Sequence, residues 1–446
     1  MNHEASGALQ TPGRKTSPWE DADDHTAGVA GAGALVGSGM TEWAKAWAQA
    51  SPFKPEAGAA LNLMRWRRFV VAEDEQFNKI VAAFTAATGV RVTVTSESFD
   101  DMQPKASVAA NTGTGPDLFW SLYSTPHLFP NRCVDVSDVA DYLGKKYGGW
   151  VPVAEAYGKL GNKWIAIPAA INGGYINYRI SQIKAAGFNE VPQTTAGFLE
   201  LCKALKAKNT PAGFPLGRAS GDGNSYAYWL LWSHNAAQVD ENSKVIIRSP
   251  ETEAALNYSK ALYDTFIQGT AAWNDASNNR LFLSGELGLT ANGISIYAAA
   301  NASNDPKQKE IAADMDHAYW PIGPAGKPTE IQLCFPMMAM TYTKFPNACK
   351  AFMFNPWLEA AAGYLTHTLN AFDNNPVWTK DPKNKVFRDA SKRSLVAGHR
   401  GKLDEKAATA MADFIVVDMF ASFCTGRESA AGAMQLAERQ LQRIYR

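Results

Sequence analysis

The stretch from Asn111 to Trp120, NTGTGPDLFW, is the most informative segment of this chain. Its Gly-x-Gly-Pro turn precedes Asp117, which leads into a short apolar run typical of a buried parallel strand. In an open α/β sheet such a strand ends at the edge where ligands bind. Trp120 and Tyr123 would lie at that edge, where aromatic faces suit a ligand with apolar C–H surfaces and a polar rim, a sugar being the common case. The alternative is a turn and a core strand without a ligand, because such turns are ordinary.

The segments on the amino-terminal side of this stretch extend the α/β pattern. Residues 61–66 predict a strand, and apolar residues at helical spacing over 77–84 predict a helix that ends at Gly89. Alternating valines over 90–94 predict a second strand, and 103–110 predict a second helix. This order of elements indicates a mainly parallel sheet with right-handed crossovers.

Length and composition describe a large globular chain. At 446 residues it is too long for one core and predicts two domains, with 46% hydrophobic and 19% charged residues. Lys and Arg number 43, as do Asp and Glu, and this balance argues against nucleic acid or an anionic membrane as the main partner. The five cysteines are far apart and predict isolated buried thiols. The chain contains no run of 18 or more apolar residues, so we predict no membrane-spanning segment.

The first 50 residues differ from the rest. Thr26–Met40 is a weakly apolar Ala/Gly stretch, and Ala48-Gln49-Ala50 forms an A-x-A site before Ser51. This arrangement is typical of the back half of a secretory leader, although acidic residues precede the apolar stretch and no twin arginine is present. A disordered tail is the alternative. We expect cleavage before Ser51, which would remove residues 1–50.

Three segments further along the chain are candidate crossings between domains: 169–172, 323–328 and 374–376. Between and after them the pattern predicts further elements. We expect helices at 181–186, 195–206, 252–267, 347–367 (interrupted at Pro356), 405–423 and 428–445, and a Met-rich strand at 333–342.

Enzyme and cofactor motifs fail on inspection. Residues 323–327 are too short for a phosphate loop, and Pro328 stands where Ser or Thr must bind magnesium. Gly221-Asp222-Gly223 lacks the third glycine of a dinucleotide fingerprint, and the chain has neither HExxH nor GxSxG. We therefore predict no catalytic residue, no metal site and no cofactor. A glycosidase carboxylate pair stays open, because its members can lie far apart in the chain.

Five segments in order resemble one family. They are LNLMRW (61–66) with the helix and TGVRVTV that follow, NTGTGPDLFW, GNKWIAIPAAINGGYINYRISQIKAAGF (161–188), NNRLFLSGELGLTANGISIY (278–297) and the helix after Pro346-Asn347. Together they resemble the extracellular solute-binding proteins of ABC importers, in the carbohydrate-binding group that includes maltose-binding protein. The resemblance covers almost all of residues 58–446. It departs from the family pattern at Arg179, where Asn is more usual after the tyrosine.

The resemblance implies a two-lobed α/β fold of the periplasmic-binding-protein type, with discontinuous domains and a ligand cleft between the lobes. We expect residues 56–170 plus 331–371 in the N-terminal lobe and residues 175–325 plus 376–446 in the C-terminal lobe. Residues 1–50 stay outside both lobes as a leader-like or disordered segment.

The resemblance also implies cleft positions. Asn172 stands where maltose-binding protein has an acidic residue, and Ser295 stands where it stacks a Trp, a role that Tyr297 would take here. These two departures leave the identity of the solute open. The candidate ligand-binding residues are Trp66, Arg67, Tyr123, Asn172, Tyr226, Tyr228, Ser295, Tyr297, Phe372, Asn375 and Trp378.

The function implied is binding, without catalysis: a periplasmic, exported component of an ABC importer that takes up a sugar or related polyhydroxylated solute. Its partners would be the solute and the membrane permease subunits, with no nucleic acid, and we expect a monomer. One alternative is an exported carbohydrate-active enzyme. Another is the same fold with a polyamine or a phosphorylated polyol, for which acidic or basic residues lining the cleft, respectively, would be the sign.

Overall fold

The computed structural model describes residues 51–354, 368–372 and 376–446. Its strands are β1 (Ala60–Trp66), β2 (Arg91–Glu97), β3 (Leu118–Trp120), β4 (Lys159–Leu160), β5 (Lys163–Trp164), β6 (Ile167–Gly173), β7 (Tyr175–Arg179), β8 (Leu289–Asn292), β9 (Met315–Ala318), β10 (Glu330–Ala339) and β11 (Ser394–Leu395). Its α-helices are α2 (Val71–Thr88), α3 (Met102–Thr112), α4 (Thr125–Leu128), α5 (Ser137–Lys146), α6 (Pro152–Gly158), α7 (Ile180–Ala185), α8 (Thr195–Ala207), α9 (Asp222–Ser233), α10 (Pro250–Tyr263), α11 (Ser277–Leu283), α12 (Ser295–Ala302), α13 (Pro306–Asp314), α14 (Pro346–Met353), α16 (Pro376–Thr379), α17 (Lys385–Arg388), α18 (Ala390–Arg393), α19 (Glu405–Ala412), α20 (Ile415–Cys424) and α21 (Ala430–Ile444). Short 3₁₀ turns lie at η2 (Pro130–Arg132), η3 (Thr270–Ala272), η4 (Asn370–Phe372) and η5 (Pro382–Asn384).

The larger sheet is mixed. Its strand order is β11-β10-β3-β1-β2, with β6 also paired to β10. Strand β1 runs parallel to β2 and β3, which confirms the parallel pattern predicted for the first three strands. Strand β10 is antiparallel to β3 and β6, because the chain returns to this sheet from the other side of the molecule. All ten residues of β10 are buried, as expected of a strand inside a covered sheet.

Helix α2 shows why the sequence folds this way locally. Phe77, Ile80 and Phe84 are buried on one face, at the spacing expected of a helix that packs on a sheet. The ring of Phe77 lies 5.3 Å from that of Trp120 and anchors the helix beside the end of β3. Gly89 ends the helix in the left-handed conformation, with its N–H donating to the carbonyl of Thr85, as the sequence predicts.

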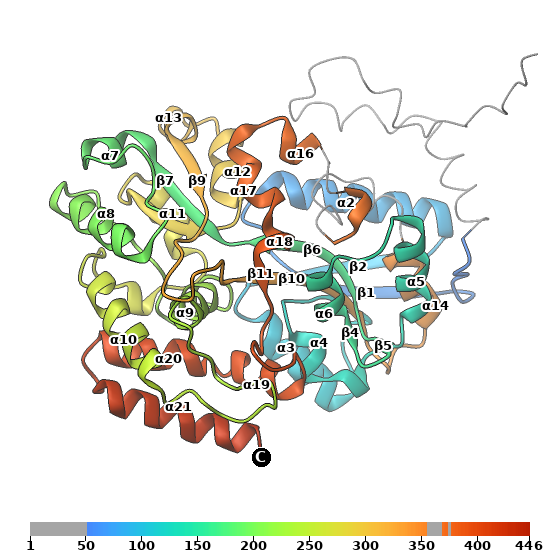
Figure 1. The fold of residues 1–446 in the computed structure, drawn as a ribbon. Coiled ribbons are helices and arrows are strands. Elements are labelled where there is room, and N and C mark those ends of the chain that lie inside the picture. The colour runs from blue at the N-terminus through green and yellow to red at the C-terminus, as the bar shows by residue number, and fades with distance from the viewer. Residues whose placement is uncertain (1–50, 355–367, 373–375) are drawn as a thin grey trace, which may run out of the picture.

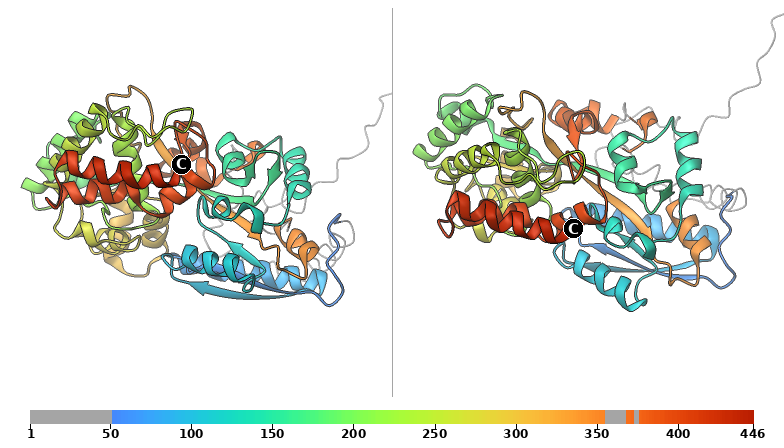
Figure 2. Two further views of the ribbon diagram at one scale, coloured as in Figure 1. Left: turned by 90° about the horizontal axis from the view of Figure 1, so that it is seen from below. Right: turned by 60° about the horizontal axis from the view of Figure 1, so that its bottom comes forward.

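A smaller antiparallel sheet, in the order β8-β7-β9, forms the centre of the second half of the molecule. Helices α9, α10, α20 and α21 pack together beside it. The predicted single helix over 405–423 is two helices, α19 and α20, because Phe414 between them adopts φ 57°. The views in Figure 1 and Figure 2 show two bodies side by side, one around each sheet.

The first crossing between the two bodies is almost a continuous strand. Strand β6 ends in the larger sheet at Gly173, and β7 begins in the smaller one at Tyr175. A Cβ added to Gly173 would lie 2.4 Å from the Tyr175 ring, so only glycine fits there. The indole N–H of Trp320 donates to the carbonyl of Gly174 at 2.6 Å and ties the crossing to the second body.

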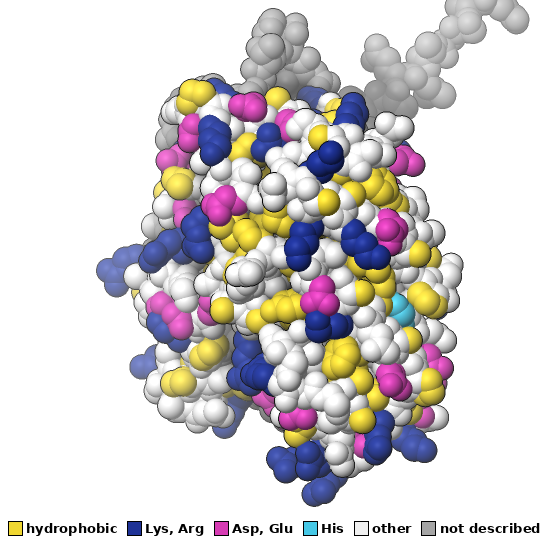
Figure 3. All heavy atoms as spheres, turned by 90° about the vertical axis from the view of Figure 1, so that its left-hand side faces the viewer, with side chains coloured by type: hydrophobic (Ala, Val, Ile, Leu, Met, Phe, Trp, Pro, Cys, Tyr) yellow, Lys and Arg dark blue, Asp and Glu magenta, His cyan; other side chains and the backbone are white. Residues whose placement is uncertain are grey.

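The stretch Glu405–Cys424 has the length and hydropathy of a membrane-crossing helix, and 61% of its apolar window is buried inside the protein. Its two helices pack on α9, α10 and α21, as a core segment does. The five cysteines are buried and free, as the sequence predicts. On the outer face of the second body, basic and acidic side chains are interspersed, in keeping with the zero net charge (Figure 3).

Candidate functional site

One wall of the candidate site is a group of aromatic side chains at the edge of the larger sheet. Trp66 ends β1, Tyr123 follows β3, and Phe335 lies in β10 between them. The rings of Trp66 and Phe335 stack with centroids 4.6 Å apart, and Tyr123 lies 5.5 Å from Phe335. Phe99, just after β2, completes the wall edge-on to Trp66 at 5.9 Å. The carboxyl ends of β1, β2 and β3 thus bring these rings together, as expected for an open α/β sheet.

Arg68 covers part of this wall. Its guanidinium carbon lies 3.3 Å from the centre of the Trp66 ring, and its Nε lies 2.7 Å from a carboxylate oxygen of Glu73. Burial lowers the pKa of Arg68 well below its usual range, and the charge of Glu73 acts against that shift. Because Phe335 and Arg68 both lie against it, Trp66 is only 4% exposed. A ligand that stacks on the indole face must therefore displace Arg68.

The opposite wall is polar and belongs to the second body. Asp275 accepts hydrogen bonds from the backbone N–H groups of Gly221 at 3.0 Å and Asp222 at 2.7 Å, where α9 begins. Asp222 in turn accepts from the side-chain amides of Asn278 at 2.8 Å and Asn292 at 3.4 Å. These bonds fix both carboxyl groups at the amino-terminal end of α9.

Both carboxyl groups have raised pKa values. Burial raises the pKa of Asp275 to about 7; the hydrogen bond from the Asp222 amide opposes this shift, and the charge of Asp100 adds to it. Burial also raises the pKa of Asp222 well above its usual range, and the charge of Asp275 adds to that shift. Each negative charge is thus held away from water and close to another negative charge.

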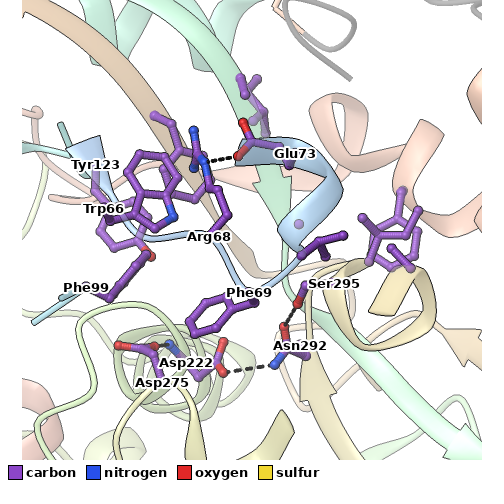
Figure 4. A pocket seen from close by; sticks show the side chains of 18 of the residues that line it. Trp66, Arg68, Phe69, Glu73, Phe99, Tyr123, Asp222, Asp275, Asn292 and Ser295 are labelled. Atoms are coloured by element: carbon purple, nitrogen blue, oxygen red, sulfur yellow. Dashed lines mark hydrogen bonds and ion pairs between the residues drawn. The ribbon is translucent and has the colours of Figure 1, made fainter. Parts of the chain in front are cut away.

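A cavity of about 410 Å³ separates the two walls. Figure 4 shows Trp66, Arg68, Tyr123 and Phe99 on one side, Asp222 and Asp275 on the other, and Phe69 between them. The volume falls in the range of small-molecule sites, which are mostly apolar with a few placed polar groups. The lining residues are Trp66, Arg68, Phe69, Val70, Glu73, Phe99, Trp120, Tyr123, Ala170, Ile171, Gly173, Asp222, Asp275, Asn292, Ile294, Ser295, Ala298, Phe335, Trp378 and Phe387.

Comparison with known families assigns the chain to one of them. Residues 79–386 match the model of a family described as bacterial extracellular solute-binding protein. The chain belongs to this family. The matched range contains both walls of the cavity apart from the segment around Trp66 and Arg68, so the predicted resemblance to extracellular solute-binding proteins is confirmed.

Solved structures of the family share the fold at low sequence identity. A sugar transporter from Arthrobacter chlorophenolicus A6 with bound laminaribiose matches with a TM-score of 0.73 and 17% identity, over 86% of this chain and 99% of that one. Maltose-bound T. maritima MalE3 matches with a TM-score of 0.74 and 17% identity, over 87% and 100%. A solute-binding protein from Agrobacterium vitis S4 with bound D-mannitol matches with a TM-score of 0.71 and 15% identity, over 86% and 98%. These likenesses confirm the predicted two-lobed fold, and the two bodies are its lobes.

The match to a curated relative covers a smaller part of the chain. The relative is a probable ABC transporter-binding protein of Deinococcus radiodurans, 23% identical over 196 residues. The match covers 42% of this chain and spans about half (46%) of the relative's length.

Four of the predicted site residues line the cavity: Trp66, Tyr123, Ser295 and Trp378. Arg67 does not line it and is exposed; the next residue, Arg68, is the one that lies there. Trp66 is the last residue of β1 and is buried, whereas Arg67 follows the strand and is exposed to solvent.

Other predicted residues lie apart from the cavity. Tyr226 and Tyr228 are each 1% exposed inside α9 and do not line the cavity. Tyr297 donates to a carboxylate oxygen of Asp381 at 2.6 Å, one residue before Ala298, which does line it.

Three predictions concern groups outside the described part of the chain. Asn172 has its backbone in β6, paired with Leu333, but its side chain is not among the described ones. The same holds for Phe372 at the end of η4, and Asn375 lies outside the described residues altogether.

Sequence reasoning missed Arg68, Phe69, Phe99, Asp222, Asp275 and Phe335 as lining residues. Phe99 had a usable signal, because it follows β2 as Tyr123 follows β3. Asp222 lies in the Gly-Asp-Gly sequence that was tested only as part of a dinucleotide motif. Asp275 lies between helices with no motif around it, and only the folded chain brings it to Gly221.

Proposed function

We propose that this chain is the substrate-binding component of an ABC importer and that it holds a sugar or related polyhydroxylated solute between its lobes. The observation that carries the proposal is the cavity of about 410 Å³, with an aromatic wall from one lobe and a hydrogen-bonding wall from the other. Sugars present apolar C–H faces and a rim of hydroxyls, and this pair of walls is complementary to both. Solutes of this class are bound in the similar structures.

The lobes we propose are residues 56–170 plus 331–371 and residues 175–325 plus 376–446. Strand pairing supports the first lobe, since β10 joins the sheet of β1 and β3 although more than 200 residues separate it from them in the chain. Strand β11 departs from this division, because it lies in the range 376–446 and pairs with β10 in the larger sheet. We propose Trp66, Tyr123, Ser295 and Trp378 as ligand contacts.

We also place the mature chain in the periplasm, as a monomer that starts near Ser51 and delivers its solute to membrane permease subunits. Membership of an extracellular family supports the export.

An exported carbohydrate-active enzyme has one observation in its favour, because Asp222 and Asp275 both face the cavity. Glycosidases, however, place their two carboxyl groups on either side of the scissile bond. Here both belong to one wall, and the N–H of Asp222 donates directly to Asp275. Binding without turnover therefore fits this geometry better. Release of a sugar from a bound glycoside would contradict it.

A thermal-shift screen of the mature chain tests the proposal. The panel should hold mono- and disaccharides, linear polyols, diamines and phosphorylated polyols. A ligand that binds only the folded state at about 100 times its Kd adds about 2.7 kcal/mol of stability and raises the midpoint by several degrees. We expect a shift with a sugar or polyol. A shift confined to the phosphorylated compounds, or none at all, would contradict the proposed function.

A further inference from the structure

The polar wall holds two carboxyl groups that have no basic partner. Asp275 is 5% exposed, and among the described residues no lysine or arginine forms an ion pair with Asp275 or Asp222. The charges that act on the pair have the same sign as the pair itself: Asp275 acts on Asp222, and Asp100 acts on Asp275. Two charges in such a place are costly unless a proton or a cation neutralises them.

The one cationic side chain among the lining residues is engaged elsewhere. Arg68 pairs with Glu73 at 2.7 Å and lies over the Trp66 ring on the opposite wall. Figure 4 shows this pair turned away from Asp222 and Asp275. Ionisation of both aspartates therefore leaves two uncompensated negative charges in a cavity that is otherwise mostly aromatic and apolar.

A second group points to a ligand at the same place. Tyr123 is 6% exposed and lines the cavity, and none of the side-chain hydrogen bonds between described residues involves its hydroxyl. A Cβ added to Gly221 would lie 2.5 Å from this hydroxyl oxygen and 2.9 Å from the Oδ1 of Asp275, so the two oxygens lie near each other beside Gly221. A hydroxyl that faces a cavity without a protein partner is expected to find one in water or in a ligand. An N–H donor placed between these oxygens would satisfy both.

The aromatic side chains suit a cation as well as a sugar. Phe69 projects between the two walls and is 39% exposed, and Phe99 and Trp378 also line the cavity. The faces of such rings attract a cationic group by their quadrupole. Rings on one side and carboxylates on the other would thus hold a positive charge from two directions.

We propose that the solute carries a protonated amine beside its hydroxyls, as an amino sugar or an aminated polyol does, with Asp275 and Asp222 binding the ammonium and Tyr123 accepting a further N–H bond. This inference rests on the proposed function and narrows it to one ligand class. Hydroxyl-only solutes satisfy the hydrogen bonds of the site but leave its charge uncompensated.

Isothermal titration with matched pairs of ligands tests the inference. The pairs are glucosamine with glucose, galactosamine with galactose, 1-amino-1-deoxyglucitol with glucitol, and deacetylated chitobiose with cellobiose. N-acetylated chitobiose adds a neutral ligand of similar size, and 1,4-diaminobutane adds an amine without hydroxyls. In the pair that fits the cavity we expect the amine member to bind at least about tenfold more tightly, and added salt to reduce this preference.

Substitutions connect the preference to the two carboxylates. Asp275→Asn and Asp222→Asn should each lower the affinity for the amine member at least about tenfold more than they lower the affinity for the neutral member of the same pair. Asp418→Asn is the matched control, because Asp418 lies in α20 with its partner Arg218 on the surface. Circular dichroism and the unliganded thermal midpoint establish that each variant is folded.

The outcomes separate the two proposals. If the neutral member of a pair binds as tightly as its amine, the inference is wrong and the proposed function stands. If 1,4-diaminobutane binds while no sugar or polyol does, amine recognition is upheld and the proposed function falls. If no ligand of the panel binds, both are contradicted. An amine preference that persists in both aspartate variants also overturns the inference.

Discussion

Asp275 is a residue whose ionisation the fold opposes. Its folded-state pKa is raised from 3.8 to about 7, so the folded chain keeps a proton that the unfolded chain releases. Where the folded state binds more protons, stability falls as pH rises. Between about pH 4 and pH 7 this one group should lower the free energy of unfolding by about 1 kcal/mol per pH unit.

Urea unfolding of the unliganded protein at steps of pH measures this effect, with Asp275→Asn as the comparison. Other titrating groups contribute to both curves, and the difference between the curves reports on Asp275. We expect the variant to gain on the parent as pH rises and to be the more stable of the two above pH 7. Curves that stay parallel over the whole range would show that Asp275 is ionised in the folded protein.

Phe69 offers a test of the aromatic contribution with little risk to folding, because 39% of its side chain is exposed and it lines the cavity. Once a ligand is known, Phe69→Ala should lower its affinity by about 2–4 kcal/mol, which is about 30- to 1,000-fold. Val71→Ala is the control, since Val71 is 71% exposed and does not line the cavity. Equal affinity of the parent and Phe69→Ala in titration calorimetry would remove Phe69 from the site.

At single positions the sequence predicts what strand ends dictate and little else. Tyr123 was predicted because parallel strands end at one edge of a sheet, and it lines the cavity. Trp66 and Arg67 were predicted from the resemblance to the family, and of these two only Trp66 lines the cavity. Asp275 was beyond prediction, since its role depends on a contact with Gly221 across 54 residues.

At the scale of elements, helix α9 serves two purposes: its amino-terminal end borders the cavity, and the rest of the helix packs in the core. From Gly223 to Ser233 every residue is buried, and Tyr226 stacks on Phe214 with centroids 4.9 Å apart. The Tyr226 hydroxyl has no hydrogen-bond partner in the described part of the chain. On folding, this hydroxyl loses its hydrogen bonds to water and gains none in the protein. Its removal should therefore not lower the stability of the folded state.

We therefore expect Tyr226→Phe to keep its stability or to gain up to about 1 kcal/mol, with ligand affinity unchanged. Tyr226→Ala should instead lose about 3–5 kcal/mol, as large cavities in aromatic cores do. Chemical denaturation measures both variants. A loss of affinity in a fully folded Tyr226→Phe would place this tyrosine back among the ligand contacts.

Element boundaries followed the sequence where local chemistry sets them. Gly89 ends α2, and Thr194 caps α8 by accepting from the N–H of Gly197, because these residues act within one turn. The break at Phe414 was not predictable, since apolar residues continue through it at helical spacing. Tertiary packing holds Phe414 in its left-handed conformation, and propensity alone would have continued the helix.

At the scale of the whole molecule, the order of segments predicted two lobes, but it did not predict what lies between them. The crossings near Gly173 and before β10 were predicted from the pattern of residues at 169–172 and 323–328, and the chain does change sheets near both segments. The charge of the cavity depends on which side chains meet when the lobes come together. At one such point Gly221 faces Tyr123 of the other lobe.

Gly221 therefore tests whether binding requires this approach of the lobes. In Gly221→Ala the added methyl would lie 2.5 Å from the hydroxyl oxygen of Tyr123, so either the Tyr123 side chain shifts or the lobes stay further apart. Its φ of −93° is open to alanine, and the fold of the lobe itself should survive. We expect the affinity to fall at least about tenfold, and small-angle scattering to detect less compaction on ligand addition than in the parent.

Because the methyl also crowds the Oδ1 of Asp275 at 2.9 Å, the double variant Gly221→Ala/Tyr123→Phe separates the two causes. Removal of the hydroxyl should restore compaction if the clash between the lobes is the cause, and should restore nothing if the displaced carboxylate is. A Gly221→Ala protein that binds and compacts like the parent would show that the lobes close without this contact.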